Sequence, residues 1–68
     1  MKAEKMVHDA NQIALFWASY PHDEALAAVV SHLRRYWEPR MRRQICEYAA
    51  QGGGGLHALA LEAVKQLG

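Results

Sequence analysis

Apolar residues recur every three or four positions along most of the chain, which is the period of one face of an α-helix. No segment shows the strict alternation of apolar and polar residues that indicates a β-strand. Pro21, Pro39 and a glycine run at residues 52–55 interrupt the helical pattern. The sequence therefore predicts an all-α fold: a small bundle of about four short helices in a single domain over residues 1–68, with a glycine-rich link before the last helix.

The first helix is expected over residues 3–18. Leu15 falls among its polar positions, and Phe16 sits at the edge of its apolar arc. A single exposed apolar side chain is ordinary in a globular protein, so Leu15 carries little weight as a contact residue. The apolar face of this helix comprises Met6, Ala10, Ile13, Ala14 and Trp17.

A second helix is expected to follow Pro21, because proline disfavours helical geometry at the residue before it. Asp23 and Glu24 place negative charge in the first turn, where the helix dipole favours it. The helix should end near Tyr36. Its predicted apolar face comprises Ala25, Leu26, Val29, Val30, Leu33, Tyr36 and Trp37.

Pro39 is the expected first residue of a third helix that ends near Gln51, with Glu38 as its N-cap. Its inward positions are Met41, Ile45, Tyr48 and Ala49. One of the four glycines should adopt a left-handed C-cap, and the others should form a flexible link. A last helix is expected over residues 56–67, and the glycine run makes its docking the least determined feature. Its apolar face comprises Leu56, Leu59, Ala60, Ala63, Val64 and Leu67.

Composition narrows the class of protein. The chain has 68 residues and is 51% hydrophobic, which argues against disorder. A chain this short buries only about 60% of its unfolded surface, and small folds of this kind usually gain stability from disulfides, a metal or a partner. Cys46 is the only cysteine, so no internal disulfide can form. The sequence lacks the roughly 18 apolar residues of a membrane span and a signal-peptide pattern, so it predicts a cytoplasmic protein.

Basic charge is concentrated in one stretch, residues 34–44, which reads RRYWEPRMRRQ. All five arginines lie there against one acid, Glu38, and give the stretch a formal charge of +4 in a chain of net charge +1. A nucleic-acid grip is disfavoured, because the pI of about 8.0 is below the values above ~9 typical of such domains. Protein docking and a solvated helix surface explain the composition equally well. The candidate partner-binding residues are Arg34, Arg35, Tyr36, Trp37, Arg40, Met41 and Arg42.

The sequence shows no recognisable catalytic, cofactor-binding or metal-ligating pattern. His8, His22, His32 and His57 have no helical ligand spacing, whereas a structural zinc site needs about four ligands. Cys46 has no orienting base nearby in sequence, and the glycine run lacks the strand and the Lys-Ser/Thr of a phosphate-binding loop. We therefore expect no catalytic, cofactor-binding or metal-binding residue in this chain.

Three segments resemble the delta subunit family of NAD-dependent formate dehydrogenase, the molybdenum- or tungsten-containing cytoplasmic kind. They are ANQIALF at 10–16, YPHDEALAAVVSHLRRYWEPRMR at 20–42 and GGGGLHALALEAVKQL at 52–67. The block WEPRMR, preceded by HLRRY, carries the most specific part of the resemblance. Asp9 stands where the family often has Met, and Glu38 stands where Asp is common.

The resemblance implies a non-catalytic accessory subunit. Such a chain docks on the large (alpha) molybdenum-bearing subunit and supports complex assembly, stability or cofactor insertion. The molybdopterin guanine dinucleotide, iron–sulfur clusters, FMN and NAD of the complex would belong to other subunits. The alternatives are a small nucleic-acid-binding regulator and a transient assembly chaperone, and self-association of the isolated chain stays open.

Overall fold

The computed structural model describes residues 2–67 and contains four helices and no strand within that range. They are α1 (Ala3–Trp17), α2 (His22–Tyr36), α3 (Pro39–Ala50) and α4 (Ala58–Leu67). The all-α prediction is confirmed. The first three helices begin and end close to the expected positions, whereas α4 begins two residues later than expected.

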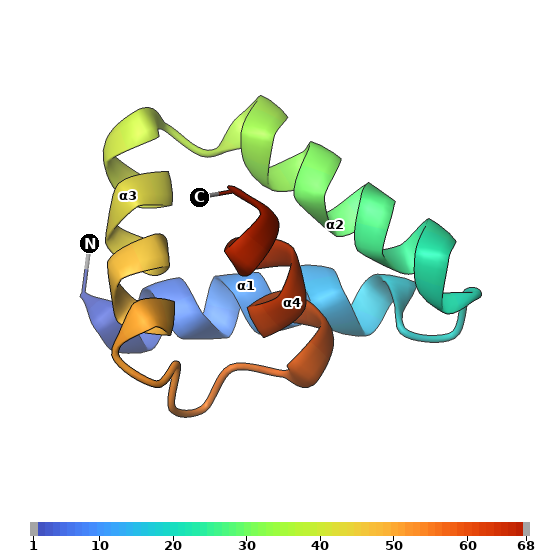
Figure 1. The fold of residues 1–68 in the computed structure, drawn as a ribbon, viewed down its shortest axis with the longest axis horizontal. Helices are drawn as coiled ribbons and strands as arrows, with labels where there is room; N and C mark the ends of the chain where they lie inside the picture. Colours follow the sequence, from blue (N-terminus) through green and yellow to red (C-terminus); the bar gives the residue numbers. More distant parts are fainter. Residues whose placement is uncertain (1, 68) are drawn as a thin grey trace.

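The last helix completes the core of the molecule. Figure 1 shows α1 along the base, with α2 and α3 diverging above it and α4 in front of them. α4 packs against each of the other three helices, and α2 and α3 meet mainly through it. Helix α4 therefore docks firmly on the rest of the fold. The buried core comprises Met6, Ala10, Ala14, Ala25, Val29, Val30, Leu33, Trp37, Ile45, Ala49, Leu59, Ala60, Ala63 and Val64.

The end of α2 separates two adjacent aromatic residues. Tyr36, predicted on the apolar face, is 67% exposed, whereas Trp37 is only 8% exposed. The helix stops at Tyr36, and Trp37 takes an extended conformation with φ −89° and ψ 135°. That change of backbone direction turns Trp37 into the core and leaves Tyr36 outside. The prediction for Tyr36 was wrong because Trp37, which leaves the helix, fills the buried place at this end of α2, so the ring of Tyr36 in the last helical turn stays in solvent.

The start of α3 is set by Pro39 rather than by a side-chain cap. Glu38 holds the N-cap position in an extended conformation, as predicted, but its side chain makes no capping hydrogen bond. The expectation that Glu38 caps through its carboxylate was therefore wrong. Pro39 needs no partner for an N–H and has a ring-fixed φ suited to a first helical turn, so it begins the helix without one.

The glycine run forms a turn held by hydrogen bonds rather than a flexible link. The N–H groups of Gly52 and Gly53 donate to the carbonyls of Ala49 and Tyr48, at 3.1 and 3.0 Å. These two bonds form the Schellman motif that closes a helix C-terminus. Gly53 is buried at φ +63°, and the Tyr48 hydroxyl donates to the Gly54 carbonyl. The prediction of a C-cap glycine is confirmed, and the prediction of flexibility is contradicted by these contacts.

Asn11 on α1 forms two hydrogen bonds with the segment that joins this turn to α4. Its side-chain nitrogen donates to the Gly55 carbonyl at 2.8 Å, and its side-chain oxygen accepts the His57 N–H at 2.8 Å. The His57 ring Nδ1 in turn accepts the Leu59 N–H at 3.1 Å, as an N-cap side chain does. This cap explains why α4 begins at Ala58, after the predicted start at Leu56.

Candidate functional site

Arg42 is an internal clamp at the junction of α2 and α3. Its Nη1 donates to the carbonyls of Arg34 and Trp37, at 2.7 and 2.8 Å. Both carbonyls lie at the end of α2, where the helix itself supplies no N–H partners. Arg42 therefore caps α2 from the first turns of α3 and holds the junction together.

Arg34 makes a similar contact with the last helix. Its Nη2 donates to the Gln66 carbonyl at 3.2 Å, close to the end of α4. Positive charge at a helix C-terminus also interacts favourably with the helix dipole. Two of the five arginines thus stabilise helix ends within the molecule, although the Arg34 side chain is otherwise exposed.

Trp37 and Met41, both predicted to bind a partner, face inward. Trp37 belongs to the core, and Met41 is partly buried and packs against it. A partner that met this junction would find these side chains already covered. Their main structural role is to connect α2 and α3 to the core.

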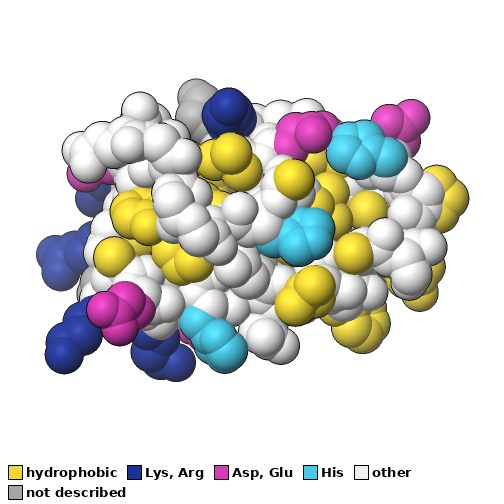
Figure 2. Space-filling model, turned by 90° about the horizontal axis from the view of Figure 1, so that it is seen from below, with side chains coloured by type: hydrophobic (Ala, Val, Ile, Leu, Met, Phe, Trp, Pro, Cys, Tyr) yellow, Lys and Arg dark blue, Asp and Glu magenta, His cyan; other side chains and the backbone are white. Residues whose placement is uncertain are grey.

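The outward-facing part of the junction comprises Arg35, Tyr36, Arg40 and Arg43, all of them exposed. The ion pairs found within residues 2–67 are Lys5–Asp9 and His22–Glu62, so these arginines have no acidic partner there. Sequence reasoning left out Arg43, although its spacing of three from Arg40 places both on one face of a helix. On the face seen in Figure 2, most of the visible Lys and Arg side chains lie toward the left end, whereas hydrophobic side chains are spread across the face and reach the right end.

Replacing Arg42 with alanine is expected to lower the free energy of unfolding by about 0.5–1.5 kcal/mol, because two carbonyls at the end of α2, one exposed and one part-buried, lose a charged donor. The matched control is Arg43→Ala on the same helix, which removes an exposed arginine and should change stability by less than about 0.5 kcal/mol. Thermal unfolding of the isolated chain measures both. Equal melting temperatures for the two variants would contradict the clamp.

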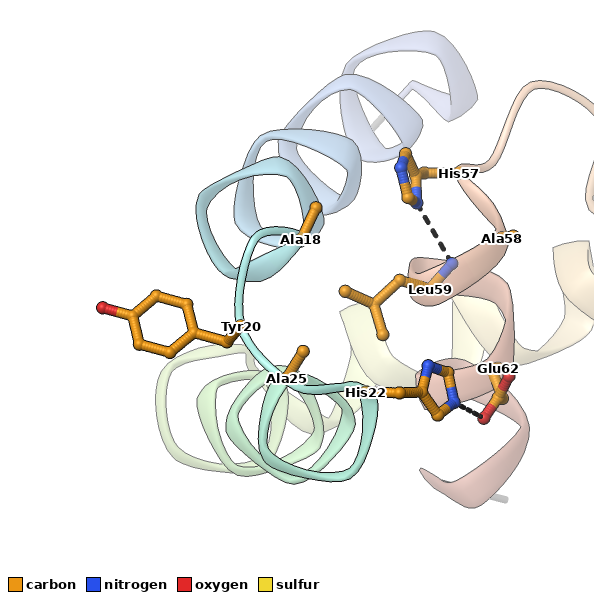
Figure 3. Close-up of a pocket in the computed structure, with 8 residues that line it drawn as sticks. All are labelled: Ala18, Tyr20, His22, Ala25, His57, Ala58, Leu59 and Glu62. Carbon is orange, nitrogen blue, oxygen red and sulfur yellow. Dashed lines mark hydrogen bonds and ion pairs between the residues drawn. The ribbon is translucent and has the colours of Figure 1, made fainter.

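His22, His57 and Cys46 make contacts within the molecule. Two histidines border a hollow of about 240 Å³ between the α1–α2 turn and α4, shown in Figure 3. His22 Nε2 lies 2.8 Å from Glu62 Oε2, and His57 is the cap already described. Burial raises the pKa of the Cys46 thiol, which donates to the Val64 carbonyl at 3.7 Å and therefore stays protonated at neutral pH. No group of three or more His, Cys, Asp or Glu side chains suited to a metal ion occurs among the described residues.

Comparison with known proteins assigns the chain to a sequence family. The model of the family described as the NADH-dependent formate dehydrogenase delta subunit, FdsD, matches residues 5–64. That range includes the whole α2–α3 junction and the Asn11 contacts with the glycine turn. No curated protein and no solved structure matches the chain. Within residues 2–67, none of the helices is long and apolar enough to cross a membrane.

Proposed function

The chain belongs to the family of the NADH-dependent formate dehydrogenase delta subunit, and from that premise we propose that it is a non-catalytic accessory subunit. In this proposal it docks on the large molybdenum-bearing subunit of a cytoplasmic formate dehydrogenase. The docking surface is the exposed part of the junction: Arg35, Tyr36, Arg40 and Arg43.

The observation that carries the docking surface is the set of exposed arginines that form no ion pair with any of residues 2–67. The chain's net charge is only +1, yet three exposed arginines cluster at one helix junction. Arginine forms paired hydrogen bonds with carboxylates through its planar guanidinium group, which lysine cannot do. A protein surface that presents carboxylates is therefore the partner that fits this junction best.

Stabilisation of the complex is the role proposed for the subunit. A ligand or partner that binds only the folded chain shifts the folding equilibrium towards it, so docking would stabilise this small core as well. We assign no cofactor to this chain. The molybdopterin guanine dinucleotide, iron–sulfur clusters, FMN and NAD of the enzyme are placed on other subunits, and cofactor insertion there is the step this chain would support.

The test is reconstitution of the enzyme from its other subunits and the purified chain. The double variant Arg40→Glu/Arg43→Glu is expected to bind at least about tenfold more weakly, a loss of roughly 1.4 kcal/mol, because attraction to carboxylates becomes repulsion. Binding can be measured by biolayer interferometry, with the activity of the reconstituted enzyme as a second readout.

The matched control is Lys2→Glu/Lys5→Glu, which makes the same change in net charge at exposed positions at the start of α1 rather than on α2 or α3. It should bind like the unchanged chain. Unchanged affinity and activity for the Arg40→Glu/Arg43→Glu variant would remove the docking role from this surface.

A further inference from the structure

An exposed aromatic surface adjoins the arginine-rich junction. The large hydrophobic side chains most exposed to solvent are Leu15 at 56%, Phe16 at 68%, Tyr20 at 46% and Tyr36 at 67%. Three of them are aromatic and lie near the half-buried Trp17 and His32. We call Phe16, Trp17, Tyr20, His32 and Tyr36 the aromatic surface. The five residues extend from the α1–α2 turn to the C-terminal end of α2, and Figure 2 shows hydrophobic side chains at the end of the molecule where that turn lies.

The rings of the aromatic surface support one another. Phe16 packs edge-on against Trp17 with centroids 5.2 Å apart, and Trp17 lies 4.8 Å from Tyr20. On α2, the His32 and Tyr36 rings are 4.8 Å apart. Side chains that are already held in place lose little conformational entropy when a partner binds them. Tyr and Trp side chains of this kind are enriched at interface hot spots.

A shallow hollow joins the two helices across this surface. It has a volume of about 260 Å³, below the roughly 300–1,000 Å³ of most small-molecule sites, so it suits a single protruding side chain better than a cofactor. Arg35 lines it and forms no ion pair within residues 2–67, and no acid is among the lining residues. The hollow is lined by Trp17, Ala28, Ser31, His32, Arg35 and Tyr36.

We infer that this hollow receives an apolar side chain next to a carboxylate on a neighbouring subunit of the enzyme. The inference rests on the proposed function and extends its docking surface from Tyr36 on α2 to Phe16 and Trp17 on α1. The rings of Trp17 and Tyr36 contact the apolar side chain, and Arg35 pairs with the carboxylate. The surface thus supplies both the apolar and the charged part of one contact.

A second copy of this chain fits the hollow less well. A twofold dimer places the same patch of each copy against the other. Here that arrangement would bring two Arg35 side chains together in a hollow whose lining residues include no acid to neutralise them. Like charges that face each other across an interface are unfavourable, so the charge pattern indicates an acidic partner of different sequence.

The test uses the full chain and the enzyme's other subunits, with affinity and hydroxyl-radical footprinting as readouts. Phe16→Ser/Tyr36→Ser removes two side chains that are each more than 60% exposed, so the fold and melting temperature should persist. We expect at least tenfold weaker binding by this variant and, in the unchanged complex, protection of Phe16 and Tyr36 from labelling. Leu15→Ser is the control, because it removes an exposed apolar side chain of the same helix that belongs neither to the aromatic surface nor to the lining of the hollow, whereas Phe16 packs on the lining residue Trp17.

The outcomes separate this inference from the proposed function. Normal binding by Phe16→Ser/Tyr36→Ser, together with weak binding by Arg40→Glu/Arg43→Glu, would overturn the aromatic contact and leave the docking proposal standing. Normal binding by both variants would overturn both. Sedimentation of the isolated chain as a dimer that Phe16→Ser/Tyr36→Ser dissociates would assign the surface to a second copy, against our inference.

Discussion

Leu33→Ala is expected to lower the free energy of unfolding by about 2–5 kcal/mol, the usual cost of emptying a fully buried leucine site. Leu33 lies on α2 with 0% exposure and belongs to the core that α4 completes. At about 0.05–0.15 kcal/mol per residue, a domain of 68 residues has a total stability of only about 3–10 kcal/mol. The substitution would therefore remove a large share of the stability of the isolated chain.

Urea denaturation of the isolated chain measures this loss. Leu15→Ala is the matched control, because the same chemical change at a side chain that is 56% exposed should cost less than about 0.5 kcal/mol. Binding to the other subunits should recover part of the stability of Leu33→Ala, about 2.7 kcal/mol when they are present at a hundredfold excess over Kd. Similar denaturation midpoints for the two variants would contradict the position of Leu33 in the core.

Gly53→Ala is expected to lower the free energy of unfolding by about 2–4 kcal/mol, for two reasons that add. Gly53 has φ +63°, a conformation that costs a residue with a Cβ about 1–2 kcal/mol. An added Cβ would also lie 2.7 Å from Leu61 Cδ1, so the Leu61 side chain on α4 would have to move. Because the turn precedes α4, the substitution should also disturb how that helix packs.

Gly54→Ala is the matched control for this effect. Gly54 is not among the glycines with positive φ, and the nearest atom to an added Cβ is the Tyr48 hydroxyl oxygen at 3.8 Å. Its replacement should be neutral or slightly stabilising, since alanine restricts the unfolded chain more than glycine does. Thermal unfolding monitored by circular dichroism compares the two variants. A Gly54 variant as unstable as the Gly53 variant would show that any side chain disrupts the turn.

The helices were predictable because each has an apolar face of helical period and a breaker at its end. Pro39 and the glycines mark ends that depend only on local backbone geometry. The start of α4 was not predictable in this way, because the two Asn11 contacts that hold Gly55 and His57 join segments more than 40 residues apart, and the local His57 cap depends on where they place that residue. No periodic pattern records a pairing across that separation.

The arginine-rich junction shows the same division between local and distant causes. Its charge and its position at a helix break could be read from the sequence. The sequence does not indicate which arginines form hydrogen bonds within the chain, because Arg42 and Arg34 donate to backbone carbonyls, which every residue possesses. Only the folded geometry separates these two from Arg35, Arg40 and Arg43. The docking role of the latter stays a prediction until the complex is tested.

The position of α4 also has a consequence for synthesis of the chain. A ribosome releases this helix after the other three, yet Leu59, Ala60, Ala63 and Val64 complete the core that α1, α2 and α3 leave open. A nascent chain without α4 therefore exposes the apolar faces of three helices, and exposed apolar surface of that kind promotes aggregation. The core can close only after α4 has left the ribosome, so the first three helices are made before they have their full packing partner.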